Sequence, residues 1–317
     1  MPSRSSDDEK AGSVSPLLTS LLFVPGDSER KQIKALTAAA DALILDLEDS
    51  VAAAQLPAAR LRVRELLTSQ KERSQQQLWV RVNSPSSGQL MEDVTAVFAG
   101  APDGLLLPKI SSAEEIIEVA HVLEALEVRD RRPIGCTKLM VIATETPQAV
   151  LNLPGYAERL AQVPEVLQRV TALTWGSEDL SAALGAASKV DEQGALTFTF
   201  QLARSLTLLA ATALGVQAID GVFVDFRNAQ GLAQEARVAR RDGFAGKLAI
   251  HPDQVDAINS AFSPSETELA RARRIVAAFA ASPQAGVLSL EGEMIDRPHL
   301  TQARRLLDRV ARRARTD

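Results

Sequence analysis

The stretch ALILDLED at residues 42–49 decides the fold: it is an unbroken apolar run that ends in acidic residues, and a segment with helical spacing follows it at residues 57–69. Buried parallel strands read as continuous apolar runs of this kind, not as alternating ones. The pattern recurs along the chain. The other runs are LLFVPG (21–26), LWVRVN (78–83), GLLLPK (104–109), KLMVIATE (138–145), ALTWGSED (172–179), GVFVDF (221–226) and KLAIHP (247–252).

Segments with helical spacing separate these runs. The clearest of them are residues 29–40, 57–69, 111–127, 197–214 and 231–242. Strands that alternate with helices predict a parallel sheet, and eight such units that close on themselves make a (β/α)8 TIM barrel. An open, doubly wound sheet is the alternative α/β fold. It is disfavoured because the first run is followed by VPGD, which holds one glycine and no dinucleotide-binding fingerprint.

Three parts are expected along the chain. Residues 1–16 are a polar leader that we expect to be disordered. Residues 17–282 form the barrel domain: the barrel itself is expected to finish with the helix that starts near Pro252, and an appended helix follows with a capping box at Ser265 and Glu268. Residues 283–317 form a C-terminal lid, and its last helix carries an apolar stripe that must pack on another surface.

Composition excludes several classes of protein. The 317 residues carry 35 basic and 40 acidic side chains, for a net charge of -5, which argues against a duplex nucleic-acid partner. A single cysteine rules out an internal disulfide framework. No apolar run approaches the roughly 18 residues of a membrane span, and the leader lacks the apolar core of a signal peptide. We therefore expect a cytoplasmic protein with neither nucleic acid nor membrane as partner.

Polar side chains follow the ends of the expected strands. In barrel enzymes the reacting groups come from the carboxyl ends of the strands and from the loops after them. The candidates at these positions are Asp46, Glu48, Asp49, Arg81, Asn83, Lys109, Glu145, Glu178, Asp179, Asp225 and His251. Because side chains alternate along a strand, Glu178 and Asp179 are not both expected to point inward.

Two of these acids predict a metal site. Glu145 and Asp179 end neighbouring strands, so their carboxylates meet at one rim. Hard oxygen ligands, with no cysteine and few histidines beside them, suit Mg²⁺, which often takes one or two carboxylates and completes its shell with water and substrate oxygens. The alternative is that the rim acids pair with Arg81 or Lys109, or cap the next helix.

The basic residues at the rim are candidates for binding anions. Arg81 offers a fixed fork for a carboxylate or a developing oxyanion, although a structural ion pair with Glu48 or Asp46 is an alternative, and both can hold. Lys109 is a candidate for substrate binding, but a lysine that ends a strand is often only solvated.

The remaining candidates have structural alternatives. His251 is as consistent with packing as with catalysis, and His121, inside a helix, is expected to be structural. Cys136 precedes the fifth strand, at the wrong end of the barrel for a nucleophile, and is expected to be inert.

Several motifs occur in the order found in a known family. The segments are VPGDSERKQIKAL (24–36), LILDLEDSVA (43–52), WVRVNS (79–84), LLLPKIS (105–111), TWGSEDL (174–180), IHPDQV (250–255) and GEMIDRPHL (292–300). The chain resembles the citrate lyase β-subunit/malyl-CoA lyase family of the HpcH/HpaI aldolase superfamily, and its tail resembles that of stand-alone lyases acting on CoA thioesters. The resemblance implies a Mg²⁺-dependent barrel with a C-terminal lid, assembled as a trimer or hexamer.

The same resemblance implies roles for individual residues. Glu145 and Asp179 match the metal ligands, and Arg81 matches the arginine that faces the thioester and substrate oxygens. Glu48 matches the acid that organises metal-bound water. Asp296 matches the acid/base that the lid brings to the site of a neighbouring subunit.

Residues after the first strand complete the implied site. Arg30, Lys31 and Lys34 are candidate partners for the CoA phosphates, although a solvated helix face explains each of them equally well.

The implied reaction is the retro-Claisen cleavage, or the formation, of a β-hydroxyacyl-CoA such as malyl-CoA or citramalyl-CoA, with an acyl-CoA and a 2-keto acid as products. A malyl-CoA thioesterase or a malate synthase-like enzyme remains an alternative on the same ligands. A true citrate lyase β-subunit, a metal-dependent aldolase that ignores CoA, and a non-enzymatic scaffold are further alternatives.

Overall fold

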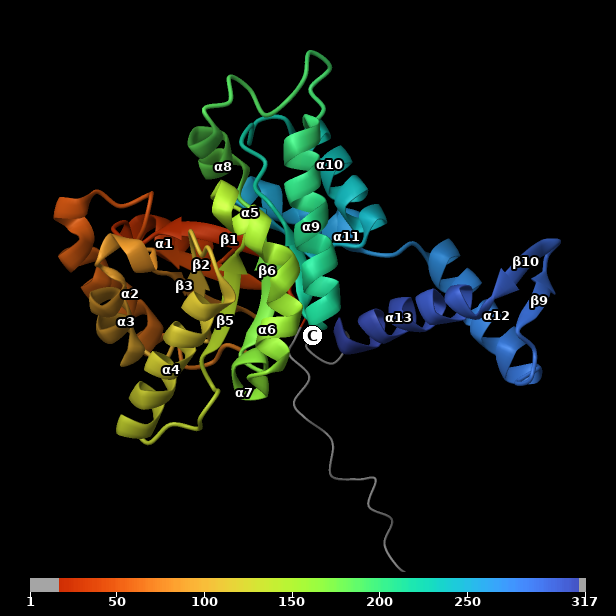
Figure 1. Cartoon of the computed structure of the whole chain (residues 1–317), viewed down its shortest axis with the longest axis horizontal. Helices are drawn as coiled ribbons and strands as arrows, with labels where there is room; N and C mark the ends of the chain where they lie inside the picture. The colour runs from red at the N-terminus through yellow and green to blue at the C-terminus, as the bar shows by residue number, and fades with distance from the viewer. Residues whose placement is uncertain (1–16, 314–317) are drawn as a thin grey trace, which may run out of the picture. The chain divides into compact units, whose positions relative to one another are not determined.

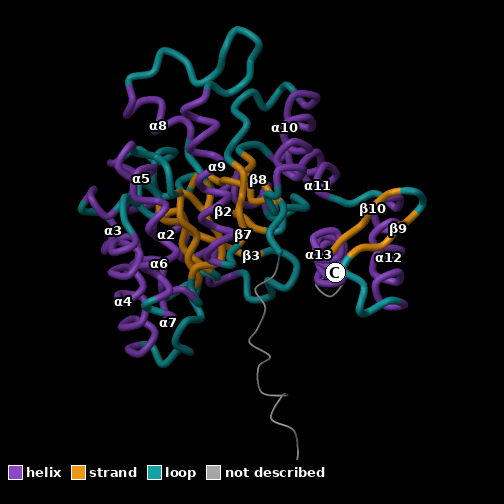
Figure 2. The backbone as a smooth tube through the Cα atoms, turned by 45° about the vertical axis from the view of Figure 1, so that its right-hand side comes forward, coloured by secondary structure: helices purple, strands orange, loops and turns teal. Residues whose placement is uncertain are grey.

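The computed structural model describes residues 17–313. In this part of the chain, eight parallel strands close into a barrel in sequence order, and β8 pairs with β1. The strands are β1 (Ser20–Pro25), β2 (Ala42–Asp46), β3 (Gln77–Arg81), β4 (Gly104–Leu107), β5 (Lys138–Ile142), β6 (Val170–Thr174), β7 (Gln217–Asp220) and β8 (Gly246–Ala249). Figure 2 shows these strands inside a ring of helices. The (β/α)8 barrel is confirmed, and the open doubly wound sheet is excluded.

Helices cover the outside of the barrel (Figure 1). They are α1 (Glu29–Ala35), α2 (Leu56–Ser69), α3 (Leu90–Phe98), α4 (Ala113–Arg129), α5 (Pro147–Asn152), α6 (Tyr156–Ala161), α7 (Pro164–Leu167), α8 (Ser177–Leu184), α9 (Phe198–Leu214), α10 (Ala229–Asp242) and α11 (Val255–Phe262). Short 3₁₀ turns are η1 (Ala53–Gln55), η2 (Pro85–Ser87), η3 (Leu153–Gly155) and η4 (Pro252–Gln254). None of the helices in the described part of the chain is both long and apolar enough to cross a bilayer.

Alternate residues of each strand separate two apolar layers. The inner layer, inside the barrel, consists of Leu21, Ala42, Ile44, Trp79, Leu106, Met140, Ile142, Ala172, Ile219 and Leu248, together with Leu18. Residues of the opposite parity, such as Leu43 and Leu45, pack with the surrounding helices. Trp79 fits inside because β4 begins with Gly104, where a Cβ atom would lie 2.3 Å from the indole ring.

The seventh strand does not lie where the sequence predicted it. The run at 221–226 is a loop, and β7 (Gln217–Asp220) precedes it. Gly215, with φ of 73°, ends α9, so the chain enters the barrel at once. The misleading run is apolar, but its Val224 and Phe226 are exposed. The acid at the carboxyl end of this strand is therefore Asp220, and not the expected Asp225.

A second compact unit follows at Pro264. It contains α12 (Glu266–Ala281), a hairpin of β9 (Val287–Leu290) and β10 (Glu293–Asp296), and α13 (Arg297–Arg313). Its core consists of Ala272, Ile275, Phe279, Ile295, Leu300 and Ala303. The expected capping box at Ser265 and Glu268 is present at the start of α12.

The boundary of this unit differs from the expected one. The sequence assigned the helix before residue 282 to the barrel, whereas α12 packs against α13 and shares its core. The hairpin was not expected either, since only helices were predicted in this region. The expected leader, residues 1–16, lies outside the described residues.

Candidate active site

Arg81 and Asp46 form the base of a charged cluster at the carboxyl ends of the strands. Asp46 ends β2 and Arg81 ends β3, and the two residues are paired in the strand register. Arg81 donates from Nε to Asp46 Oδ1 over 2.6 Å and from Nη2 to Oδ2 over 2.7 Å. Burial alone would raise the pKa of Asp46, but the hydrogen bonds and charge of Arg81 hold it below the ordinary value. This bidentate pair fixes the guanidinium.

The remaining amino group of Arg81 faces two more acids. Its Nη1 lies 3.0 Å from Glu48 Oε2 and 3.2 Å from Asp49 Oδ2. The guanidinium also stacks 4.8 Å from the centre of the Phe23 ring. The expected structural ion pairs of Arg81 with Asp46 and Glu48 are therefore both present, and the cation lies at the rim where a substrate would bind.

Glu48 is a buried acid, and one of its two carboxylate oxygens accepts no hydrogen bond. Its Oε1 accepts a hydrogen bond of 2.6 Å from Lys109 Nζ. Its Oε2 is buried and has no hydrogen-bond partner among the described residues, because the contact to Arg81 Nη1 lacks hydrogen-bond geometry. Burial raises the pKa of Glu48 to about 7, against the opposing effect of Arg81 and Lys109. An orphaned carboxylate oxygen at this depth suits an ordered water.

Lys109 connects this acid with the two expected metal ligands. Its backbone is left-handed, with φ of 53°, and its N–H donates to Glu145 Oε2. Its ammonium lies 3.3 Å from Asp49 Oδ1 and 3.4 Å from Asp179 Oδ1, in addition to its bond with Glu48. The acids raise the pKa of Lys109 although burial opposes them. The alternative anticipated for the rim acids, pairing with Lys109, is thus realised for Asp179.

Glu145 is a deeply buried acid of this cluster. It is only 3% exposed. Burial, with the neighbouring carboxylates of Glu48 and Asp179, raises its pKa to about 8. Gly176 makes room for it, since a Cβ there would lie 2.6 Å from Glu145 Cγ. The carboxylates of this site therefore outnumber its two cationic side chains, Arg81 and Lys109.

Asp179 reaches the cluster from a helix and not from a strand. It lies in the first turn of α8, which begins at Ser177. Its neighbour Glu178 points elsewhere and pairs with Lys189. The prediction that only one of these two acids faces the site is correct, although the reason is the helix and not strand alternation.

The donor set is suited to a hard divalent cation. Glu145 and Asp179 offer carboxylate oxygens, and Glu48 adds the buried oxygen that accepts no hydrogen bond, although it lies 3.0 Å from Arg81 Nη1. No group of three or more histidine, cysteine or acidic side chains within residues 17–313 is arranged to bind a metal by itself. That shortfall is compatible with Mg²⁺, which fills its remaining positions with water and substrate oxygens. Glu145 and Asp179 could therefore hold Mg²⁺ together with a chelating substrate.

Other candidate residues lie apart from this cluster. Arg30, Lys31 and Lys34 are exposed on α1, the helix that follows β1. Asn83 is engaged by Asp93 and by the backbone of Leu47.

Four more candidates have structural roles or none. His251 accepts a hydrogen bond from the backbone of Asp253 at η4 and stacks on Phe226. Asp225 and His121 are exposed. The thiol of Cys136 lies 3.4 Å from Glu127 Oε1, next to the buried pair of Glu127 and Arg169.

Asp296 belongs to the C-terminal unit. It ends β10, and its Oδ1 lies 2.5 Å from Nδ1 of His299. The sequence singled out Asp296 but not His299. The signal was available as an acid and a histidine three residues apart at the start of a helix, which is the spacing of an N-cap and its N3 residue.

A second set of residues escaped the sequence analysis. Lys247 is fully buried on β8 and donates to Asp220, to Glu235 and to the backbone of Gly221. Asp220, which ends β7, also accepts a hydrogen bond from the indole N–H of Trp175. Trp175 follows β6 and shortly precedes Asp179 in the sequence. The misplaced seventh strand hid this network.

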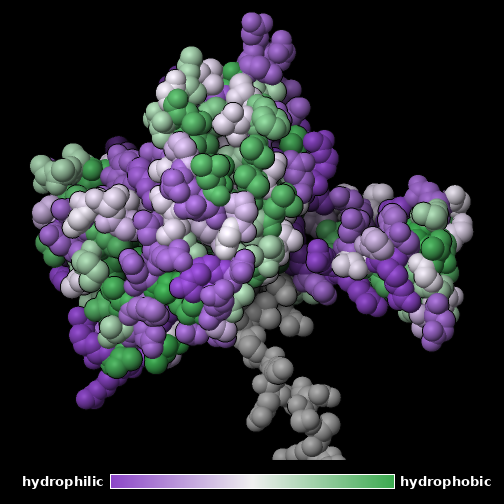
Figure 3. All heavy atoms as spheres, in the orientation of Figure 1, coloured by the Kyte–Doolittle hydropathy of each residue, from purple (hydrophilic) through white to green (hydrophobic). Residues whose placement is uncertain are grey.

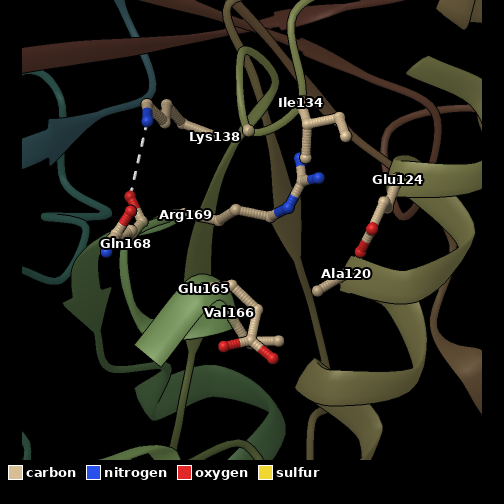
Figure 4. A pocket seen from close by; sticks show the side chains of 9 residues that line it. Ala120, Glu124, Ile134, Lys138, Glu165, Val166, Gln168 and Arg169 are labelled. Carbon is tan, nitrogen blue, oxygen red and sulfur yellow. Dashed lines mark hydrogen bonds between the residues drawn. The ribbon is translucent and has the colours of Figure 1, made fainter. Parts of the chain in front are cut away.

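A small cavity lies at the other end of the barrel. Its volume is about 170 Å³, and its lining includes Lys138, which begins β5, and Arg169, which directly precedes β6. Figure 4 shows Arg169 among the side chains that line the cavity, together with Glu124 and Glu165. Because it lies at the amino ends of the strands, this cavity is distinct from the carboxylate cluster.

Fold and site together define a class: a (β/α)8 barrel with an acidic, metal-compatible cluster and a buried arginine at the carboxyl rim. The family model for HpcH/HpaI aldolase/citrate lyase matches residues 19–252. The chain belongs to this family.

Two relatives that are named after lyases are similar over most of the chain. Human mitochondrial citramalyl-CoA lyase is 35% identical over 89% of this chain and 82% of its own length. The citrate lyase subunit beta-like protein of Mycobacterium tuberculosis is 37% identical over 91% of this chain and 94% of its own.

A solved structure shares the fold. The CitE protein of Mycobacterium tuberculosis in complex with magnesium, acetoacetate and coenzyme A superposes with a TM-score of 0.75 at 34% identity, over 93% of this chain and 98% of that one. The relatives are named as lyases, and this solved relative holds both a metal and a CoA.

Proposed function

We propose that this protein is a Mg²⁺-dependent carbon–carbon lyase that cleaves or forms a β-hydroxyacyl-CoA such as citramalyl-CoA or malyl-CoA. The observation that carries the proposal is the convergence of Glu145 and Asp179 on one rim with the fixed guanidinium of Arg81. The family membership and the relative solved with magnesium and coenzyme A support it.

The chain's own residues supply distinct parts of the chemistry. Glu145 and Asp179 would hold Mg²⁺, which would supply a Lewis acid to the substrate oxygens. Arg81, which cannot turn away from Asp46, presents a fixed charge where the thioester oxygen becomes an enolate oxygen. Glu48, with a pKa raised by burial to about 7, can hold a water or a proton beside it.

Asp296 is proposed as the acid/base for the acyl carbon. In cleavage it protonates the enolate carbon, and in condensation it removes the same proton. Asp296 lies on the outer face of the hairpin, with the exposed side chains of Met294 and Val287 on the same face. Two exposed apolar residues beside an acid suit a face that covers a site and keeps water from it.

The protein is further proposed to be a homo-oligomer, a trimer or hexamer, in which this lid serves a neighbouring subunit. A stripe on α9 supports an oligomer, because its Phe198, Leu202 and Leu209 are exposed. Leu151 of α5 and Leu184 of α8 are exposed as well. Figure 3 shows hydrophobic residues gathered over these three helices. An exposed apolar surface of this kind is typical of a contact between subunits.

Coenzyme A is proposed to bind along α1. Arg30 and Lys34 there are exposed and follow β1 at the same rim as the acids, so they can meet the phosphates. Lys109 is proposed to contact the substrate after it leaves Asp179. The cytoplasmic location expected from the sequence stays a prediction, since one relative is named as mitochondrial.

The proposal is tested by assaying the purified protein with Mg²⁺ and with EDTA against citramalyl-CoA, malyl-CoA and their shorter and longer analogues. Keto acid and free thiol are detected separately. Keto acid without thiol, lost in EDTA, supports the lyase. Thiol without keto acid indicates a thioesterase and overturns the proposal, as does cleavage of the free hydroxy acids alone, which indicates an aldolase that ignores CoA.

A further inference from the structure

The hairpin presents Asp296 at a sharply defined position. Ile295, directly before it, is fully buried in the core of the C-terminal unit, so Asp296 points to the opposite face. Asp296 pairs with Val287 across the hairpin. The helix α13 begins at the next residue, Arg297, so Asp296 occupies the position of an N-cap.

His299 holds one oxygen of this carboxylate. Its Nδ1 lies 2.5 Å from Asp296 Oδ1, and its backbone N–H points to the same oxygen over 3.5 Å. The amide nitrogen of Asp296 is farther from Nδ1, at 3.2 Å. A carboxylate oxygen and a ring nitrogen 2.5 Å apart need a proton between them, so we assign the tautomer in which Nδ1 donates to Oδ1 and does not accept from the backbone N–H of Asp296. Among the described residues, Oδ2 has no recorded partner and is left for a substrate.

Four other charged side chains on α12 and the hairpin form two ion pairs with one another. Arg271 and Arg274 of α12 pair with Glu293 and Glu291 of the hairpin. The guanidinium of Arg297 donates to the backbone of Pro283 and stacks on Phe279. The hydrogen bond from His299, with its charge when protonated, holds the pKa of Asp296 below the ordinary value. His299 is thus the neighbour that governs this carboxylate.

We infer that His299 is the positioning residue for Asp296: it binds Oδ1 and leaves Oδ2 as the atom that exchanges a proton with the acyl carbon. The inference rests on the proposed function of Asp296. In condensation, the C–H bond of the acyl-CoA breaks as the Oδ2–H bond forms, and the electron pair stays on the enolate; in cleavage the same proton returns. Proton transfer to carbon needs a defined approach of the carboxylate. A carboxylate that nothing holds samples many rotamers, so the contact with His299 favours the transfer.

Three variants of the full-length protein test this inference. His299→Leu removes the donor, and His299→Asn keeps an N–H near the position of Nδ1. His121→Leu, on the exposed side of α4, is the matched control. The measurements are the exchange of the acetyl-CoA methyl protons in D₂O, kcat and KM for cleavage, and the pH profile of kcat/KM.

We expect His299→Leu to lower proton exchange and kcat about tenfold, with KM within about twofold of the parent, since substrate binding does not use this residue. In cleavage Asp296 must start with a proton, so the alkaline limb of kcat/KM moves to higher pH, because the hydrogen bond no longer lowers the pKa of Asp296. We expect His299→Asn to recover most of the loss and His121→Leu to match the parent. Unchanged exchange and pH profile in His299→Leu, or no recovery in His299→Asn, overturns the inference.

Asp296→Asn separates this inference from the proposed function. If Asp296→Asn abolishes exchange while His299→Leu leaves it intact, the acid/base role stands and the role of His299 is overturned. If Asp296→Asn leaves exchange intact, both are overturned. Circular dichroism of each variant shows whether α13 still forms, so that a loss of fold is not mistaken for a loss of positioning.

Discussion

Arg81 and Asp46 are neighbours in the register of β2 and β3, and the guanidinium binds both oxygens of the carboxylate. The pair is buried at the rim, and the same arginine then faces Glu48 and Asp49. A single interaction therefore serves both the barrel and the site. It closes two strands at their carboxyl ends and fixes a cation beside the acids that are proposed to hold Mg²⁺.

The first prediction concerns stability. Asp46→Asn should lower the free energy of unfolding by about 3 kcal/mol, because it removes one partner of a buried ion pair and leaves Arg81 poorly neutralised. Urea unfolding followed by circular dichroism measures the change. The control Asp130→Asn breaks a pair with Arg129 that is exposed, and it should leave the unfolding midpoint unchanged. Equal midpoints for Asp46→Asn and the parent would show that the buried pair contributes little.

The second prediction concerns the metal. Asp179→Ala should abolish Mg²⁺-dependent turnover with the fold intact, because Mg²⁺ would lose one of two protein carboxylates. Titration calorimetry with MgCl₂ and the lyase assay measure the two effects. Glu178→Ala is the matched control, since Glu178 precedes it on α8 but pairs with Lys189. Full activity in the purified Asp179→Ala protein would remove the metal assignment.

The third prediction concerns Lys109. Its ammonium lies 3.4 Å from Asp179 Oδ1, so it competes with a metal for that carboxylate. Lys109→Met should raise the affinity for Mg²⁺ without substrate by about threefold or more, because a positive charge leaves the acidic cluster. Turnover should fall nonetheless if Lys109 contacts the substrate. Calorimetry on the substrate-free protein decides the matter, and a lower Mg²⁺ affinity would contradict the prediction.

How far the sequence could predict this site depends on backbone geometry. Asp46, Arg81 and Glu145 were identifiable because the carboxyl ends of parallel strands meet at one rim, whichever conformation their side chains adopt. The left-handed backbone of Lys109 was not, since nothing in LLLPK requires φ of 53° at a lysine. Its double role, with the N–H on Glu145 and the ammonium among three acids, is a tertiary property.

Other features escaped for related reasons. The network of Lys247 and Asp220 depends on where β7 ends, and the apolar loop after β7 has a stronger strand pattern than QAID itself. A lysine in a strand gives no sign of being fully buried until its partners are known. The hairpin β9–β10 was missed because it is short and its turn is Glu291 and Gly292, both with positive φ.

The fourth prediction concerns acid stability. Burial would raise the pKa of Glu127, but the hydrogen bonds from Arg169, Thr137 and Gly135 lower it to about 2. A carboxyl group whose folded pKa is depressed stabilises the fold above its unfolded pKa, near 4.5, and this contribution is lost as the pH falls toward 2. Glu127→Gln should therefore be less stable than the parent at pH 7, and the difference should shrink between about pH 4.5 and 2.

Thermal unfolding across that range measures the effect. Glu124→Gln, on the same helix but without such a partner network, should follow the parent at every pH. A gap between Glu127→Gln and the parent that stays constant from pH 7 to 2 would contradict the assigned pKa of Glu127.

The last prediction concerns sharing between subunits. Arg81→Ala chains keep an intact Asp296, and Asp296→Ala chains keep an intact Arg81. Each variant should be inactive by itself, because none of its sites holds both residues. If the lid serves a neighbouring subunit, equal random mixing brings the two intact residues together in about a quarter of the sites, and the mixture should recover about a quarter of the parent activity. If Asp296 serves its own barrel, no site is complete. Native mass spectrometry confirms that subunits have exchanged, and an exchanged mixture without activity would refute the shared lid.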